Sequence, residues 1–164
     1  MVEKVRKIRV PVRKKDAHTI EAFVEKICDD FGIFNSYYGN ILFTVNEAVN
    51  FAAGNEAGEV DFVDIQFVSK AEGLVFQVFL RDRFLEIAVL FSKSVGDTLE
   101  KEELTEEEKN MVMIRMLSDE VNLDPDREMM ELVFYISSIN QHLTLERIKV
   151  LDEYFTKLHQ PKTA

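Results

Sequence analysis

The spacing of apolar residues along the chain predicts a domain that combines strands with helices. Five short stretches show the alternation, or the short apolar run, that is typical of strands. They span residues 5–12, 61–68, 74–80, 121–123 and 130–136. Gly73 predicts the turn of a hairpin between the second and third stretches, and residues 124–126, Asp-Pro-Asp, predict a turn that joins the last two stretches as a pair. Pro11 predicts a sheet edge for the first, because proline cannot donate to a strand ladder.

Three further stretches place apolar residues three or four positions apart, as an amphipathic helix does. Residue types that cap helix N-termini stand at their starts, namely Asp16, Ser36 and Thr105. Glu108 follows Thr105 at the spacing of a capping box. Gly32 and Gly54 are expected to end the first two helices. The segment from Phe84 to Gly96 has no clear period, and we assign it no element.

A last amphipathic stretch runs from Leu143 to Leu158. Its apolar residues recur at helical spacing at Leu145, Ile148, Leu151, Phe155 and Leu158. Such a stripe has to be buried. It can dock on its own domain or form an interface with a partner, and the sequence leaves both alternatives open.

The order of these elements predicts an α+β fold. We expect a two-layer α/β sandwich, in which a mostly antiparallel sheet carries its helices on one face. Residues 1–137 would form the core of the domain. Residues 138–164 would add the C-terminal helix as an extension of the same domain.

Composition limits the classes of function. The chain has 164 residues and a net charge of −10, which argues against a nucleic-acid partner because phosphate contacts need clustered cations. The basic run from Lys4 to Lys15 alternates with apolar residues, as a solvated strand face does. No apolar run spans a membrane and no signal peptide is evident, so we expect a cytoplasmic protein. Its single cysteine, Cys28, is expected to be a small buried residue rather than a reactive thiol.

Residues 46–52 read Asn-Glu-Ala-Val-Asn-Phe-Ala. This segment resembles the nucleotide-site helix of the GHKL ATPases, and most closely that of the bacterial anti-sigma-factor serine kinases. The resemblance implies that Glu47 is the general base or orients the attacking water. The family's Mg²⁺-binding asparagine falls at Phe51, whose ring has no lone pair for a hard cation. A second register pairs Asn46 with Asn50 in histidine-kinase spacing, and a plain polar helix face is a third interpretation.

The family's adenine site, an Asp-x-Gly-x-Gly motif, falls after the second hairpin strand. Asp82 matches the aspartate that reads the adenine amino group, and Phe84 and Glu86 stand where the resemblance implies glycines. Glycine is needed where the backbone takes a positive φ or passes close to a ligand. A phenyl ring at this place would fill the space meant for adenine. An ordinary turn residue after a strand is an equally good interpretation of Asp82.

The lid helix of the family also begins with glycines, and these fall on Glu108 and Asn110. The apolar pattern and the Asp-Glu-Val that follow it, at Asp119–Val121, match the family. Phosphates bind at such a helix start because free N–H groups and the helix dipole attract anions. Glutamates at the start of this helix would oppose a triphosphate. A solvated helix start favoured by the dipole explains them equally well.

The resemblance implies two functions. The first is a non-catalytic module that needs no cofactor and binds a sigma factor or an antagonist protein, as a monomer or as a homodimer. The alternative is an active ATP-dependent serine protein kinase that uses Mg-ATP, Glu47 and Asp82. A third interpretation is an α/β sandwich outside this family. The three histidines have no metal-ligand spacing, so we expect no metal site.

Overall fold

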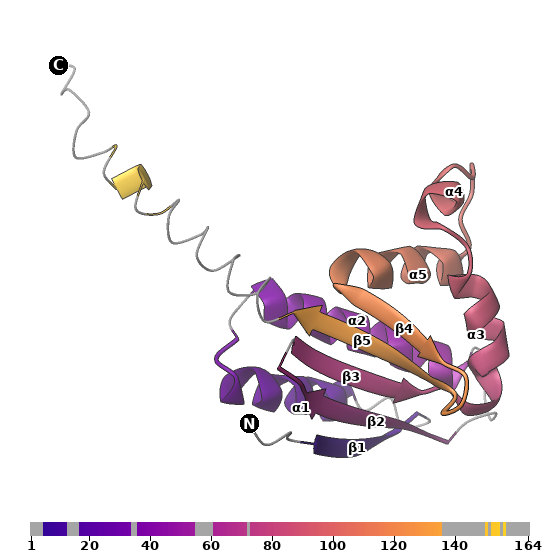
Figure 1. Ribbon diagram of the computed structural model, residues 1–164, viewed down its shortest axis with the longest axis horizontal. Helices are drawn as coiled ribbons and strands as arrows, with labels where there is room; N and C mark the ends of the chain where they lie inside the picture. The colour runs from indigo at the N-terminus through magenta and orange to yellow at the C-terminus, as the bar shows by residue number, and fades with distance from the viewer. Residues whose placement is uncertain are drawn as a thin grey trace.

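The computed structural model describes residues 5–12, 17–33, 36–54, 61–71, 73–135, 150, 152–154 and 156 (Figure 1). The predicted cap at Asp16 lies outside the described residues, as does most of the predicted C-terminal helix. Within that helix, residues 150, 152–154 and 156 are helical, and Val150 and Tyr154 are exposed.

Five strands form one sheet in the order β1-β2-β3-β5-β4, and each pair of neighbours is antiparallel. The strands are β1 (Val5–Pro11), β2 (Phe62–Ser69), β3 (Gly73–Phe79), β4 (Glu120–Asp124) and β5 (Met129–Tyr135). Both predicted hairpins, β2–β3 and β4–β5, are confirmed. The strand that ends at Pro11 is at a sheet edge, as its proline predicted.

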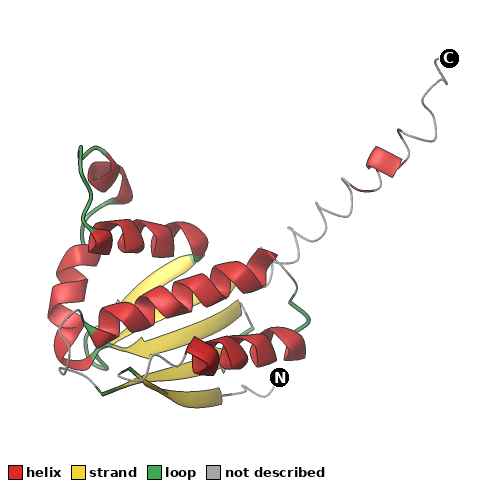
Figure 2. Ribbon diagram, turned by 180° about the vertical axis from the view of Figure 1, so that it is seen from behind, coloured by secondary structure: helices red, strands yellow, loops and turns green. Residues whose placement is uncertain are grey.

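The helices of the described chain are α1 (Ala17–Asp30), α2 (Ser36–Ala53), α3 (Phe84–Phe91), α4 (Val95–Leu99) and α5 (Glu106–Leu117), with a short 3-10 turn, η1 (Arg81–Arg83). Figure 2 shows α1, α2 and α5 on the same face of the sheet. The structure is therefore α+β, with an antiparallel sheet and a helical layer.

Local sequence signals set the helix ends. Gly32 and Gly54 follow α1 and α2 with φ of 66° and 79°, a left-handed conformation that costs glycine little. The capping box at the start of α5 is present, with Thr105 and Glu108 bonding each other's backbone N–H. These predictions are confirmed.

The core lies between the sheet and the helical layer. Alternate strand residues face it, and three fully buried phenylalanines, Phe67, Phe76 and Phe134, line it along β2, β3 and β5. The ring centroids of Phe67 and Phe76 are 5.2 Å apart, and those of Phe76 and Phe134 are 6.1 Å apart. Cys28 also lies in the core, as predicted, and is 2% exposed.

The segment without a clear sequence period forms α3 and α4. Helix α3 buries Phe84, Ile87 and Leu90. It also leaves Leu85 and Val89 at 76% and 66% exposure. Because α3 is apolar on both its buried and its exposed side, its sequence shows no amphipathic pattern.

In the part of the chain that the structure describes, no helix has both the length and the apolar character needed to cross a lipid bilayer.

Candidate functional site

The C-terminal half of α2 carries the residues that the resemblance places around a nucleotide. Asn46 and Glu47 are half-buried and Asn50 is exposed. Burial raises the pKa of the Glu47 carboxyl, and the charge of Glu106 on α5 adds to the rise, while a hydrogen bond with Asn50 lowers it. A half-buried carboxyl with a raised pKa is suited to accept a proton.

Phe51 is part of the hydrophobic core. Its side chain is 5% exposed, and its ring meets that of Phe91 edge-on with 5.7 Å between centroids. Its carbonyl oxygen is one of the last four of α2, which have no partner within the helix. Arg83 on η1 satisfies it by donating from Nε at 2.7 Å. A cation at a helix C-terminus is also favoured by the helix dipole.

The residues of the predicted adenine motif, which follow β3, differ in their exposure to solvent. Asp82 is exposed, whereas Phe84 begins α3 and is 6% exposed. Glu86 is exposed and pairs with Arg83 at 3.4 Å. Asp82 and Ala52, at the end of α2, both line a cavity of about 330 Å³. Glu47 is not among the residues that line this cavity.

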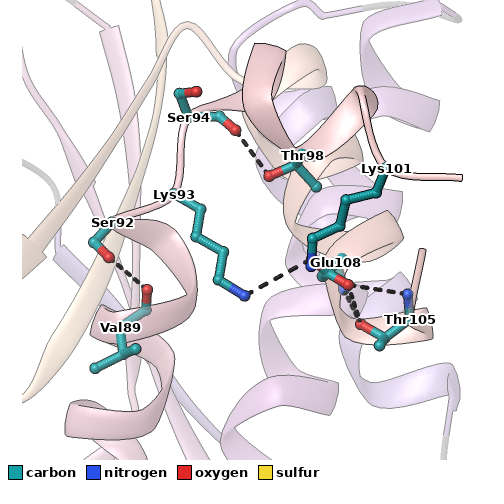
Figure 3. A network of polar contacts seen from close by, with 8 residues as sticks. All are labelled: Val89, Ser92, Lys93, Ser94, Thr98, Lys101, Thr105 and Glu108. Atoms are coloured by element: carbon teal, nitrogen blue, oxygen red, sulfur yellow. Dashed lines mark hydrogen bonds and ion pairs between the residues drawn. The ribbon is translucent and has the colours of Figure 1, made fainter. Parts of the chain in front are cut away.

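Glu108 on α5 is the centre of a polar network that reaches the segments on either side of α4 (Figure 3). Its carboxylate is almost fully buried and accepts a hydrogen bond from Lys101 Nζ at 2.6 Å. Lys93 Nζ lies 3.8 Å from the same oxygen, and the Thr105 backbone and hydroxyl donate to the other oxygen. The Lys101 hydrogen bond and the Thr105 backbone N–H lower the pKa of Glu108 to about 2.

This network changes how the start of α5 is understood. The sequence placed a repelling charge at Glu108, but the structure neutralises that charge with two lysines. Glu106 stays exposed in the same turn, and Asn110 is half-buried one turn further on. The negative charge that faces solvent at this helix start therefore comes from Glu106 and Glu107 and not from Glu108.

A second polar cluster lies on the sheet face opposite the helices. Arg9 on β1 donates to Asp64 on β2 from Nε at 2.9 Å and from Nη2 at 3.4 Å. Arg81 Nη2 donates to the same carboxylate at 2.5 Å. The hydrogen bond from Arg9 is the main cause that lowers the pKa of Asp64. Sequence reasoning did not find this cluster, which needs the β1–β2 register that pairs Arg9 with Asp64.

The backbone at Arg81 is unusual. Arg81 and Glu128 have φ of 50° and 52°, in the left-handed region that disfavours residues with a Cβ. The two positions meet, because the N–H groups of Leu80 and Arg81 both donate to the Glu128 carbonyl, at 2.8 and 3.2 Å. Contacts from outside the turn therefore hold Arg81 in place.

The described residues contain no group of three or more His, Cys, Asp and Glu side chains arranged to hold a metal ion.

No known protein-family model matches the chain. No curated protein matches its sequence significantly.

Proposed function

We propose that this chain is a non-catalytic protein-binding module, a degenerate relative of the anti-sigma-factor kinases. The observation that carries the proposal is the packing of Phe51. A Mg²⁺ ion on α2 needs an oxygen ligand at this position. The chain instead has a ring that is 5% exposed and packed against Phe91. Replacing ligands with buried apolar surface makes ion binding there strongly unfavourable.

Two further positions support the proposal. Phe84 takes the place of the first adenine-site glycine and belongs to the core. Glu108 takes the place of a lid glycine, and its ion pairs tie α5 to Lys93 and Lys101. A lid that closes over a nucleotide has to move, whereas this segment is fastened by a buried carboxylate.

The outer side of α3 supports a protein partner. Leu85 and Val89 are four residues apart, so they lie on one side of the helix, and both are more than half exposed. An apolar stripe in water favours a protein surface that covers it. By the resemblance, that partner is a sigma factor or an antagonist protein.

Two observations favour the alternative, an active serine protein kinase. Glu47 has a raised pKa, as a general base requires, and Asp82 lines a cavity at the end of α2. In that case Mg-ATP is the cofactor, and Asn46 or Asn50 holds the metal.

Co-purification tests the proposal. The tagged chain is recovered from the cells that naturally produce it, and bound proteins are identified by mass spectrometry. We expect a protein partner that is lost from the double variant Leu85→Lys, Val89→Lys. The matched control is Val5→Lys on β1, which changes an apolar side chain that is 50% exposed and lies on a different element.

Retention of the partner by the double variant contradicts the role of α3. Recovery of bound nucleotide, together with phosphate transfer to serine that Glu47→Gln abolishes, contradicts the module and establishes the kinase.

A further inference from the structure

The sheet face opposite the helices is hollowed beside the edge strand β1. A groove of about 410 Å³ is lined by side chains or backbone of Lys7, Ile8, Arg9, Asp64, Ile65, Gln66, Phe79 and Arg81. It adjoins the 330 Å³ cavity, with which it shares Arg9, Asp64, Phe79 and Arg81. Each volume is within the range of small-molecule sites.

Positive charge exceeds negative charge in this groove. Its lining holds three cations, Lys7, Arg9 and Arg81, and one carboxylate, Asp64. No carboxylate of the described chain forms an ion pair with Lys7. A local surplus of cations is unexpected in a chain of net charge −10. A groove of one charge sign concentrates ligands of the opposite sign.

The two arginines keep donors available. A guanidinium has five N–H donors. Arg9 uses Nε and Nη2 for Asp64, and Arg81 uses Nη2. Both side chains are 64% exposed, so the remaining donors reach the groove. Asp64 thus positions two guanidinium groups together without using up their hydrogen-bonding capacity, and such groups bind carboxylate and phosphate oxygens in pairs.

Two features show that the cluster is built rather than incidental. Arg81 is held at φ 50° although a glycine would take that conformation without cost. Backbone strain of this kind persists where surrounding structure enforces it, and it gathers at functional sites. In addition, one carboxylate, that of Asp64, accepts hydrogen bonds from both arginines, which come from different parts of the chain.

We propose that this groove binds an anionic ligand, whose carboxylate or phosphate group is held by Arg9 and Arg81 and whose apolar part packs on Phe79. Phe79 lines both hollows. The site lies on the sheet, and its lining includes neither Phe51 nor Glu47. The site does not depend on whether α3 binds a protein. It adjoins the cavity that reaches Ala52 and Asp82, so Asp82→Ala, which leaves the groove's own lining unchanged, separates anion binding in the groove from nucleotide binding at α2.

The test is a titration of the full chain with inorganic phosphate and, separately, with succinate, each against sodium chloride of the same ionic strength. Backbone amide chemical shifts report binding. We expect saturable shifts at Lys7–Arg9 and Asp64–Gln66 with at least one probe. Saturation by phosphate alone assigns the site to phosphoryl ligands, and saturation by succinate alone or by both probes assigns it to carboxylates or to anions in general.

Arg9→Gln should weaken binding about tenfold or more, because one charge-assisted donor group is lost. Arg81→Gly should weaken it similarly while relieving the backbone strain, so a loss of binding in that variant is not a loss of fold. The matched control is Arg127→Gln, another exposed arginine that pairs with one aspartate, Asp124, at 4.0 Å. This control should bind as the unchanged chain does.

Shifts that do not saturate with either probe, or saturable binding that Arg9→Gln and Arg81→Gly leave unchanged, overturn the proposal.

Discussion

Arg83 reaches from η1 to the end of α2 and donates a hydrogen bond from Nε to the carbonyl oxygen of Phe51, at 2.7 Å. Phe51 is thus fixed through its backbone as well as its side chain. Its ring packs on Phe91 at the end of α3. Phe51 therefore contacts η1 through its carbonyl oxygen and α3 through its ring.

Truncation of Phe51 should measure this structural role. We predict that Phe51→Ala lowers the free energy of unfolding by about 3 kcal/mol or more, because a buried aromatic ring leaves a cavity. Phe62→Ala is the control, since Phe62 is 50% exposed and its ring lies under the guanidinium of Arg9, at 5.6 Å. Urea unfolding followed by circular dichroism gives both values. Equal losses in the two variants contradict a core role for Phe51.

The Glu108 network should make the free energy of unfolding depend on pH. The folded state lowers the pKa of Glu108 from 4.5 to about 2, so the stabilisation is complete above pH 4.5 and is lost as the pH falls toward 2. Glu108→Gln should therefore be less stable than the unchanged chain at pH 7, and the difference should shrink between these two values. The exposed Glu103→Gln is the control. If Glu108→Gln and the unchanged chain differ in free energy of unfolding by the same amount at pH 7 and pH 3, the ion pairs of Glu108 do not stabilise the fold.

Two glycines should respond in opposite directions to alanine. A Cβ at Gly73 would lie 2.3 Å from the backbone oxygen of Phe134, which the sheet holds in place. Gly73→Ala should cost about 1–3 kcal/mol, as overpacking does. A Cβ at Gly39, inside α2, meets nothing within 4 Å. Gly39→Ala should stabilise by about 1 kcal/mol through helix propensity. Thermal unfolding of both variants checks the two signs.

The thiol of Cys28 should be protected by folding. Burial raises its pKa to about 11, and the side chain is 2% exposed. At pH 8 the folded chain should react with a thiol reagent only as fast as it unfolds, while the urea-unfolded chain should react at once. Rapid reaction in native buffer would show that the thiol is accessible.

Sequence alone predicted the parts of this fold that local chemistry decides. The capping box at Thr105, the glycines after α1 and α2, and the strand pairs around Gly73 and residues 125–128 all depend on residues close together in the chain. Helix α3 escaped prediction because Leu85 and Val89 are apolar yet exposed, so its two sides look alike in the sequence.

The candidate sites depend on contacts that no local pattern contains. The cluster of Arg9, Asp64 and Arg81 contains a hydrogen bond between residues 55 positions apart, and only the β1–β2 register brings Arg9 to Asp64. The ion pairs of Glu108 could not be predicted from the sequence for a similar reason. Its capping role is local and was predicted, but its neutralisation by Lys101 and Lys93 requires the segments on either side of α4 to fold back onto α5.

The proposed loss of the nucleotide site is tested most directly by calorimetric titration of the full chain with ATP, in Mg²⁺ and then in excess chelator. The Arg9→Gln variant is titrated in parallel, so that phosphate binding in the sheet groove is separated from binding at α2. We predict no Mg²⁺-dependent binding at millimolar ATP in either chain. Saturable, Mg²⁺-dependent binding that survives Arg9→Gln and disappears in Asp82→Ala would contradict the proposal and favour the active kinase.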